Sequence, residues 1–211
     1  MGTHWRSDEP YQVAPGFLQL YWKTHELTKA CVLTGAVVIF LLLFSTLSVA
    51  LPIFGGFVQI PFRSLAEAVC AGVFVNSLSV RTDFDSADTG ILRRVSRHAA
   101  FVTLVAGSGL FCALEWVRRL PYPPAWAATF AFIFGCSLVV QRFCPVRFPW
   151  AIAVIIYFAL VEMIGFMPDT MQDWDVLSAT EWTWPVAVYC VVGGVLTILA
   201  TSVRGSRRVP R

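Results

Sequence analysis

The sequence predicts an all-α integral membrane protein, a bundle of about six transmembrane helices with both chain ends on one side of the membrane. Composition predicts the class, because 57% of the 211 residues are hydrophobic and 14% are charged, against about 45–50% and about 25% in soluble domains. The apolar residues are gathered into stretches close to the ~20 residues that a helix needs to cross a bilayer core. The basic residues between these stretches predict the orientation.

The predicted spans divide the chain into a polar N-terminal segment (1–28), a transmembrane domain (29–203) and a basic C-terminal tail (204–211). Their ends follow from charged residues, from prolines that stop a helix, and from Trp and Tyr side chains that favour the headgroup layer. The second span is the least hydrophobic, and the first, fourth and sixth contain no charged residue. The six spans are residues 31–54, 61–80, 98–117, 125–140, 148–167 and 184–203.

The N-terminal segment ends in a stretch that would be amphipathic as a helix. Phe17, Leu20, Tyr21 and Leu27 would share one face, and the charged residues would lie elsewhere. This pattern predicts a short interfacial helix before the first span. The alternative is an ordinary solvated lead-in.

The orientation follows from the positions of the Lys and Arg residues. With the N-terminus inside, thirteen of the 16 basic residues lie on the inner side, and Arg63, Arg118 and Arg119 lie on the outer side. Basic segments favour the cytoplasmic side of a membrane, so an even number of spans with both ends inside explains the distribution. The sequence is compatible with a bacterial inner membrane and with a eukaryotic organellar membrane.

Ionisable residues within the predicted spans are few, and all of them lie toward the outer side. They are Arg63, Glu67, Glu115 and Glu162. Such residues are costly in a bilayer, so they are candidate functional residues. Arg63 and Glu67 are four residues apart and would meet on one helix face. Glu115 precedes Arg118 and Arg119 by three and four residues, which predicts a second local pairing.

Glu162 has no basic residue within one helical turn. We predict that it is buried against protein and pairs with Arg63, Arg118 or Arg119 from another helix, because a lone carboxylate in the membrane would be costly. The alternative is that Glu162 binds a cation, a proton or the head group of a substrate.

A strip of small and polar residues runs along the second span. Ser64, Ala68, Gly72 and Asn76 recur every four residues, and such strips let two helices approach closely. Asn76 would form a hydrogen bond across that contact. Helix packing is therefore the prediction for this strip, and the lining of a solute pathway is the alternative.

The sequence shows no pattern for a cofactor, a metal ion or a nucleic acid. Its three His residues lie outside the interiors of the predicted spans, which leaves haem and zinc sites of the usual kinds unsupported. It contains no Gly-rich phosphate loop with a Lys, and no clustered basic surface of the kind that nucleic-acid binding needs. We therefore predict no catalytic residue, no cofactor and no metal site.

Two functions remain open. The first is a non-catalytic multi-span subunit that packs within and stabilises a larger membrane complex, with the lipid bilayer and other membrane subunits, or further copies of itself, as partners. The absence of ionisable residues near the middle of the spans favours it, because transporters commonly bind their substrates there. The alternative is an oligomeric small-solute transporter or channel. A division into three plus three inverted spans would place Glu67 and Glu162 at equivalent outer depths.

Overall fold

The structure is a computed structural model of the 211-residue chain. It describes residues 22, 26–44, 48–53, 56–79, 90–117, 125–144, 148–168, 174–177 and 183–202. These residues form six α-helices and one two-stranded hairpin, which confirms the predicted helical class. Most of the predicted interfacial helix, and the whole basic tail, lie outside the described residues.

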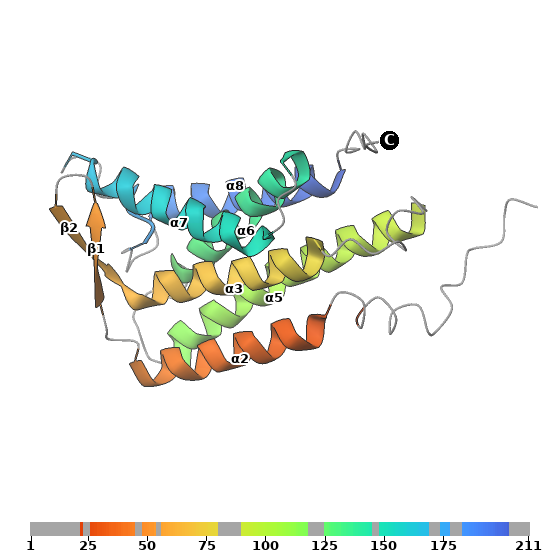
Figure 1. Ribbon diagram of the computed structural model, residues 1–211, viewed down its shortest axis with the longest axis horizontal. Coiled ribbons are helices and arrows are strands. Elements are labelled where there is room, and N and C mark those ends of the chain that lie inside the picture. The colour runs from red at the N-terminus through yellow and green to blue at the C-terminus, as the bar shows by residue number, and fades with distance from the viewer. Residues whose placement is uncertain are drawn as a thin grey trace, which may run out of the picture.

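Successive helices alternate in direction along the bundle (Figure 1). One end carries the hairpin and is called the hairpin end; the other holds the start of α2 and the end of α8 and is called the basal end. The helices are α2 (Leu27–Phe44), α3 (Phe62–Ser79), α5 (Gly90–Val117), α6 (Ala125–Phe143), α7 (Pro149–Gly165) and α8 (Trp184–Ser202).

The hairpin was not predicted, and it shortens the first predicted span. Strand β1 (Ser48–Ile53) pairs in antiparallel fashion with β2 (Gly56–Pro61), whereas the prediction continued a helix to residue 54. The helix α2 ends at Phe44 instead. Pro52 disfavours the predicted continuation of the helix to residue 54, because proline lacks the N–H of a helical hydrogen bond and clashes with the preceding turn. At the tip of the described hairpin, Ile53 pairs with Gly56.

The third predicted span begins too late. Helix α5 begins at Gly90, eight residues before the predicted start, and contains 28 residues. At 1.5 Å per residue it is about 42 Å long, which exceeds the roughly 30 Å of a bilayer core. Its first turns extend past the neighbouring helices at the basal end (Figure 1). The second, fourth, fifth and sixth predicted spans agree with helices α3, α6, α7 and α8 to within three residues at each end.

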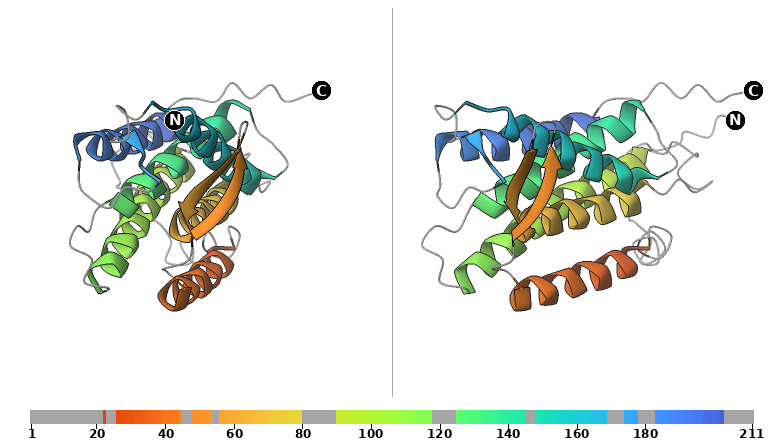
Figure 2. Two further views of the ribbon diagram at one scale, coloured as in Figure 1. Left: turned by 90° about the vertical axis from the view of Figure 1, so that its left-hand side faces the viewer. Right: turned by 60° about the vertical axis from the view of Figure 1, so that its left-hand side comes forward.

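Helices α3 and α6 form the centre of the bundle. Helix α3 packs against α2, α5, α6 and α7, and α6 packs against α3, α5, α7 and α8. Helix α2 packs chiefly against α3 and lies at the edge of the bundle (Figure 2). The core between the helices is rich in aromatic side chains that are less than 2% exposed: Phe111, Phe130, Phe134 and Tyr157.

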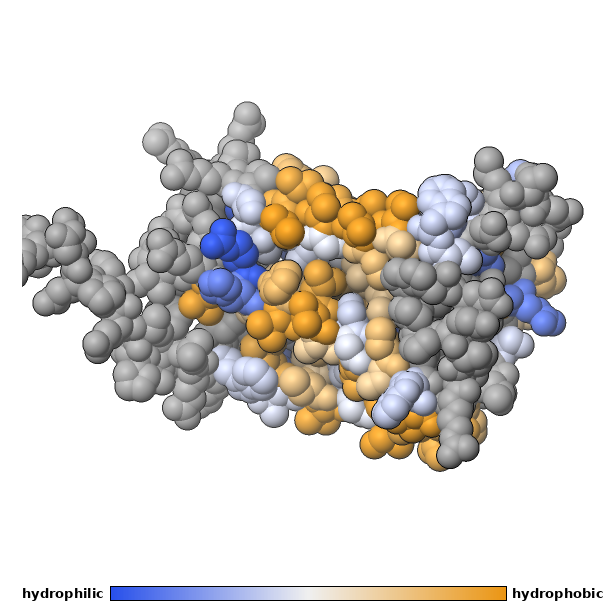
Figure 3. Space-filling view, turned by 180° about the vertical axis from the view of Figure 1, so that it is seen from behind, coloured by the Kyte–Doolittle hydropathy of each residue, from blue (hydrophilic) through white to orange (hydrophobic). Residues whose placement is uncertain are grey.

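The outer helices carry the exposed apolar side chains. Helices α2, α5, α7 and α8 hold most of the large hydrophobic residues on the surface, and these gather in a band across the middle of the molecule with more polar residues toward both ends (Figure 3). Among the described residues, three helical segments are long and apolar enough to cross a membrane: Leu27–Phe44, Val95–Leu114 and Trp184–Ser202. Helices α6 and α7 contribute shorter apolar segments.

Candidate functional site

The first turns of α3 hold three buried polar side chains at the hairpin end of the bundle. Arg63 is 8% exposed, and Ser64 and Glu67 are each 1% exposed. Strand β2 leads directly into the helix, and the Ser64 hydroxyl donates a hydrogen bond of 2.8 Å to the carbonyl oxygen of Pro61 at that junction. The spacing of Arg63 and Glu67 places them on one face of the helix. Both side chains have interaction partners within the protein.

Tyr157 of α7 completes this polar cluster. Its hydroxyl oxygen lies 3.5 Å from the Ser64 Oγ, and its side chain is 1% exposed. The Glu67 carboxylate lies close enough to interact electrostatically with Tyr157 and with Cys70, one turn farther along α3. Arg63, Ser64, Glu67 and Tyr157 are called the α3–α7 polar cluster.

Tyr157 was missed by the sequence analysis. Membrane tyrosines favour the headgroup layer, but Tyr157 stands in the middle of the fifth predicted span. Such a position is a signal of a buried hydrogen-bonding partner, because a phenol hydroxyl seeks one when it is removed from water. The pairing with Ser64 could not be predicted, because the two residues are 93 positions apart.

The α3–α7 polar cluster combines a carboxylate, a guanidinium group, a phenol and a hydroxyl in an apolar bundle. Buried charges are costly unless they are paired and hydrogen-bonded. The arrangement is chemically able to hold two helices in register, to bind a small cation or to pass a proton between Glu67 and Tyr157. In the described part of the chain, no three His, Cys, Asp or Glu side chains are grouped so as to hold a metal ion.

The predicted strip along α3 lies partly against α7. A Cβ atom added to Gly72 would lie 3.1 Å from the carbonyl oxygen of Trp150 and 3.3 Å from the Cβ of Ala153. Ala68 is fully buried, and Asn76 is half-buried. The strip therefore includes a point of close helix approach at Gly72. The predicted hydrogen bond of Asn76 stays a prediction.

The remaining predicted site residues are only partly described. Glu115 lies in α5, but its side chain, together with Arg118 and Arg119, lies outside the described residues. Glu162 is half-buried near the end of α7 and has an interaction partner within the protein. Its pairing with an arginine stays a prediction. Glu162 and the fully buried Glu67 occupy different environments, although the three-plus-three division would make them equivalent.

Close helix packing at other glycines was not predicted. A Cβ atom on Gly135 would overlap the carbonyl of Gly193, and one on Gly193 would overlap the carbonyl of Ala131. Helices α6 and α8 therefore touch backbone to backbone. Small residues four apart, Ala131 and Gly135 on α6 and Gly193 and Thr197 on α8, are the signal that could have indicated this contact.

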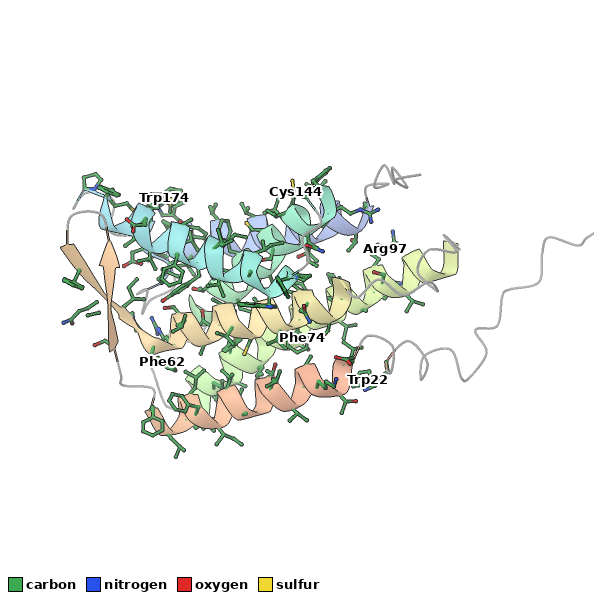
Figure 4. All side chains as sticks on the ribbon, viewed as in Figure 1. Trp22, Phe62, Phe74, Arg97, Cys144 and Trp174 are labelled. Atoms are coloured by element: carbon green, nitrogen blue, oxygen red, sulfur yellow. The ribbon has the colours of Figure 1, made fainter. Side chains whose placement is uncertain are left out.

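The segment between α7 and α8 is anchored in the hairpin end of the bundle, where Figure 4 labels Trp174. Val176 and Leu177 are 2% and 1% exposed. The Thr129 hydroxyl of α6 donates a hydrogen bond of 3.1 Å to the Val176 carbonyl, and the Tyr189 hydroxyl of α8 donates one of 3.3 Å to the Trp174 carbonyl. This segment therefore joins α6 and α8 at the same end as the α3–α7 polar cluster.

No known protein family, curated protein or solved structure matches the chain.

Proposed function

We propose that this chain is a six-span integral membrane protein. The alternating direction of the helices supports this (Figure 1), and so does the apolar surface of α2, α5, α7 and α8. Helix α3 is less apolar than α2, α6, α7 and α8, but Val69 is its only exposed side chain among those described, so its polar groups are covered by protein. Helix α7 has 17 residues and is about 26 Å long, near the lower limit for a span.

The basal end is the inner end in this proposal. Exposed Lys29 lies there at the start of α2, exposed Arg97 lies about two turns into α5, and half-buried Arg142 lies at the end of α6. At the hairpin end, the described basic residue is Arg63, which is buried. This distribution follows the preference of basic residues for the cytoplasmic side.

Cysteine labelling in intact cells tests the topology. In a chain whose six cysteines are replaced by alanine, we expect Gly2→Cys and Val209→Cys to be protected from a membrane-impermeant maleimide. Gln59→Cys, at an exposed position in the hairpin, is expected to react, because the hairpin would lie outside. Permeabilised cells serve as the control, since all three sites should then be labelled. Opposite accessibility of residues 2 and 209 would contradict an even number of spans.

Within the membrane, we propose that the chain serves as a non-catalytic subunit of a larger complex. The observation that carries this is a set of outward-facing glycines. A Cβ atom added to Gly35, Gly109 or Gly194 would have no protein atom within 4 Å, in contrast to Gly72, which touches a neighbouring helix. Glycine weakens a helix by about 1 kcal/mol relative to alanine. Contact with lipid does not offset this cost, because lipid does not require a small side chain. On a membrane-facing helix, small residues allow a second helix to approach closely.

Substitution of the outward-facing glycines tests the subunit proposal. We expect Gly35→Leu and Gly109→Leu to reduce the mass of the complex extracted in mild detergent, because the new side chain prevents close approach by a partner helix. The thermal stability of the isolated chain should not fall, since both sites are open in the structure. The mass is measured by size-exclusion chromatography with light scattering.

Exposed valines provide the matched controls for this experiment. Val32 on α2 is 65% exposed and Val102 on α5 is 62% exposed. We expect Val32→Leu and Val102→Leu to leave the mass unchanged, because both positions already carry a large side chain. An unchanged mass in both glycine variants would place those faces of α2 and α5 against lipid and would remove the support for a subunit role.

The second candidate function is a small-solute transporter or channel, and the α3–α7 polar cluster favours it. Glu67, Ser64 and Tyr157 provide buried groups that are able to bind a cation or a proton within a span. Proteoliposomes that contain only this chain distinguish the two candidates. A proton or potassium flux that Glu67→Gln abolishes would favour the transporter. An ion flux no greater than that of protein-free liposomes would favour the subunit.

A further inference from the structure

Helix α5 changes from basic to apolar along its exposed side near the basal end. Arg97 and His98 are exposed, and Figure 4 labels Arg97 in this part of the helix. In the next two turns, Phe101, Val102 and Val105 are 51%, 62% and 55% exposed. The side therefore presents cationic and hydrogen-bonding groups first and a hydrocarbon surface directly after them.

These residues follow one another along the helix surface. Arg97, Phe101 and Val105 are spaced by four residues, and His98, Val102 and Val105 by four and three, so neighbours along each row are adjacent on the surface. They span about 12 Å along the axis at 1.5 Å per residue. Arg97, His98, Phe101, Val102 and Val105 are called the α5 stripe.

The α5 stripe crosses the level at which the helix would enter the bilayer. The membrane-compatible part of α5 begins at Val95, and the preceding turns project beyond the other helices (Figure 1). Arg93 and Arg94 lie in those turns of the helix. The anionic headgroups of the inner leaflet attract basic residues at the level where a helix enters the membrane.

We propose that the α5 stripe binds one anionic phospholipid of the inner leaflet. The Arg97 guanidinium and the His98 ring donate hydrogen bonds to the phosphate, since guanidinium forms charge-assisted bonds with phosphate oxygens. An acyl chain lies along Phe101, Val102 and Val105. The inference rests on the proposed function, because it needs α5 to span the membrane with its basal end inside.

The polar part of the α5 stripe is continuous with its apolar part, and this order favours a lipid as the ligand. A free phosphate ion would use Arg97 and His98 but would leave the three apolar side chains uncovered. An anionic phospholipid has the matching order of groups, with one charged head and hydrocarbon attached to it. Gly109, at the proposed partner contact, lies one further turn along α5, so both contacts fit on the same helix.

Native mass spectrometry of the intact protein in mild detergent tests this proposal. Phosphatidylglycerol and phosphatidylcholine with identical acyl chains are titrated separately. We expect wild type to prefer phosphatidylglycerol, and the double variant Arg97→Gln with His98→Gln to bind it about tenfold more weakly, as the loss of a charge-assisted hydrogen bond implies. Lys29→Gln, which changes an exposed basic residue at the same end, is expected to keep the wild-type preference.

Two further measurements distinguish binding of the acyl chain from binding of the phosphate. Phe101→Ser is expected to weaken binding of both lipids, because it removes acyl contact and leaves the charges in place. Excess inorganic phosphate is expected not to displace phosphatidylglycerol; displacement would show a site for free phosphate and would overturn the proposal. An equal preference in wild type and in the double variant would also overturn it. The cysteine labelling decides the six-span topology independently, so failure of one proposal is distinguishable from failure of the other.

Discussion

Replacing Gly193 with alanine is expected to lower the free energy of unfolding by about 2–3 kcal/mol, toward the upper range for an over-packed interior. The added Cβ would overlap the backbone carbonyl of Ala131 on α6. Backbone cannot move aside as the end of a flexible side chain does, so α6 and α8 would have to separate. Loss of close packing along this pair would also disturb Gly135, whose nearest neighbour is Gly193 itself. Thermal unfolding in detergent, followed by near-UV circular dichroism, measures the loss.

The adjacent glycine is the matched control for this expectation. A Cβ atom on Gly194 meets nothing within 4 Å, so Gly194→Ala changes the same residue type, one position along the same helix, without a clash. We expect its stability to equal wild type or to rise by up to about 1 kcal/mol through helix propensity. Equal losses in Gly193→Ala and Gly194→Ala would show that backbone conformation, and not helix contact, decides the effect.

Replacing Glu67 with leucine is expected to destabilise the protein by about 3–5 kcal/mol. We predict that Glu67 pairs with Arg63, and this is the usual loss when one member of a buried charged pair is removed. Arg63, which is 8% exposed, would keep its charge inside the bundle without the carboxylate one turn away. Glu67→Gln is expected to cost less, because the amide still accepts a hydrogen bond. The measurement is the unfolding midpoint of each variant in the same detergent.

A double-mutant cycle tests whether the two charges act together. If Arg63 and Glu67 compensate each other, Arg63→Leu with Glu67→Leu should be more stable than the sum of the single losses predicts. Glu26→Leu is the comparison at the surface. Its carboxylate lies 2.6 Å from the Lys29 ammonium in an exposed ion pair, for which a loss below about 1 kcal/mol is expected. Additive losses at Arg63 and Glu67 would show that each charge is compensated by other groups.

The subunit and lipid proposals assign different parts of the α5 surface. Gly109 would contact a partner helix about 6 Å beyond Val105 along α5, and the α5 stripe would hold a lipid nearer the basal end. The Gly109→Leu variant is therefore expected to keep the preference for phosphatidylglycerol while it loses the partner. Each proposal can then be judged from its own measurement on the same set of variants.

The ends of several helices were determined by the sequence itself. Pro149 begins α7 and Pro185 lies in the first turn of α8, where proline fits because its nitrogen does not need to donate a helical hydrogen bond. These signals are local, so the boundaries could be predicted within three residues. Segment 48–61 shows the limit of such reasoning. Its apolar composition resembles that of a span, whereas a strand is decided by its pairing with another strand, and hydropathy does not report pairing.

The candidate site was determined in part by local spacing. The shared face of Arg63 and Glu67, and the strip through Gly72, follow from helical geometry within α3 alone. Tyr157 could not be assigned to the same site, because its contact with Ser64 depends on how α7 packs against α3. The low hydropathy of α3 likewise indicated an unusual span, but its central position is fixed by the four helices around it.

The glycines show most clearly what the tertiary structure decides beyond the sequence. The sequence predicted close helix approach for the strip of small residues along α3, because such strips let two helices approach closely. Only the packing of the bundle decided that Gly72, Gly135 and Gly193 face a neighbouring helix while Gly35, Gly109 and Gly194 face outward. The physical reason is that a glycine has no side chain to prefer either environment, so its role is set by whatever lies opposite.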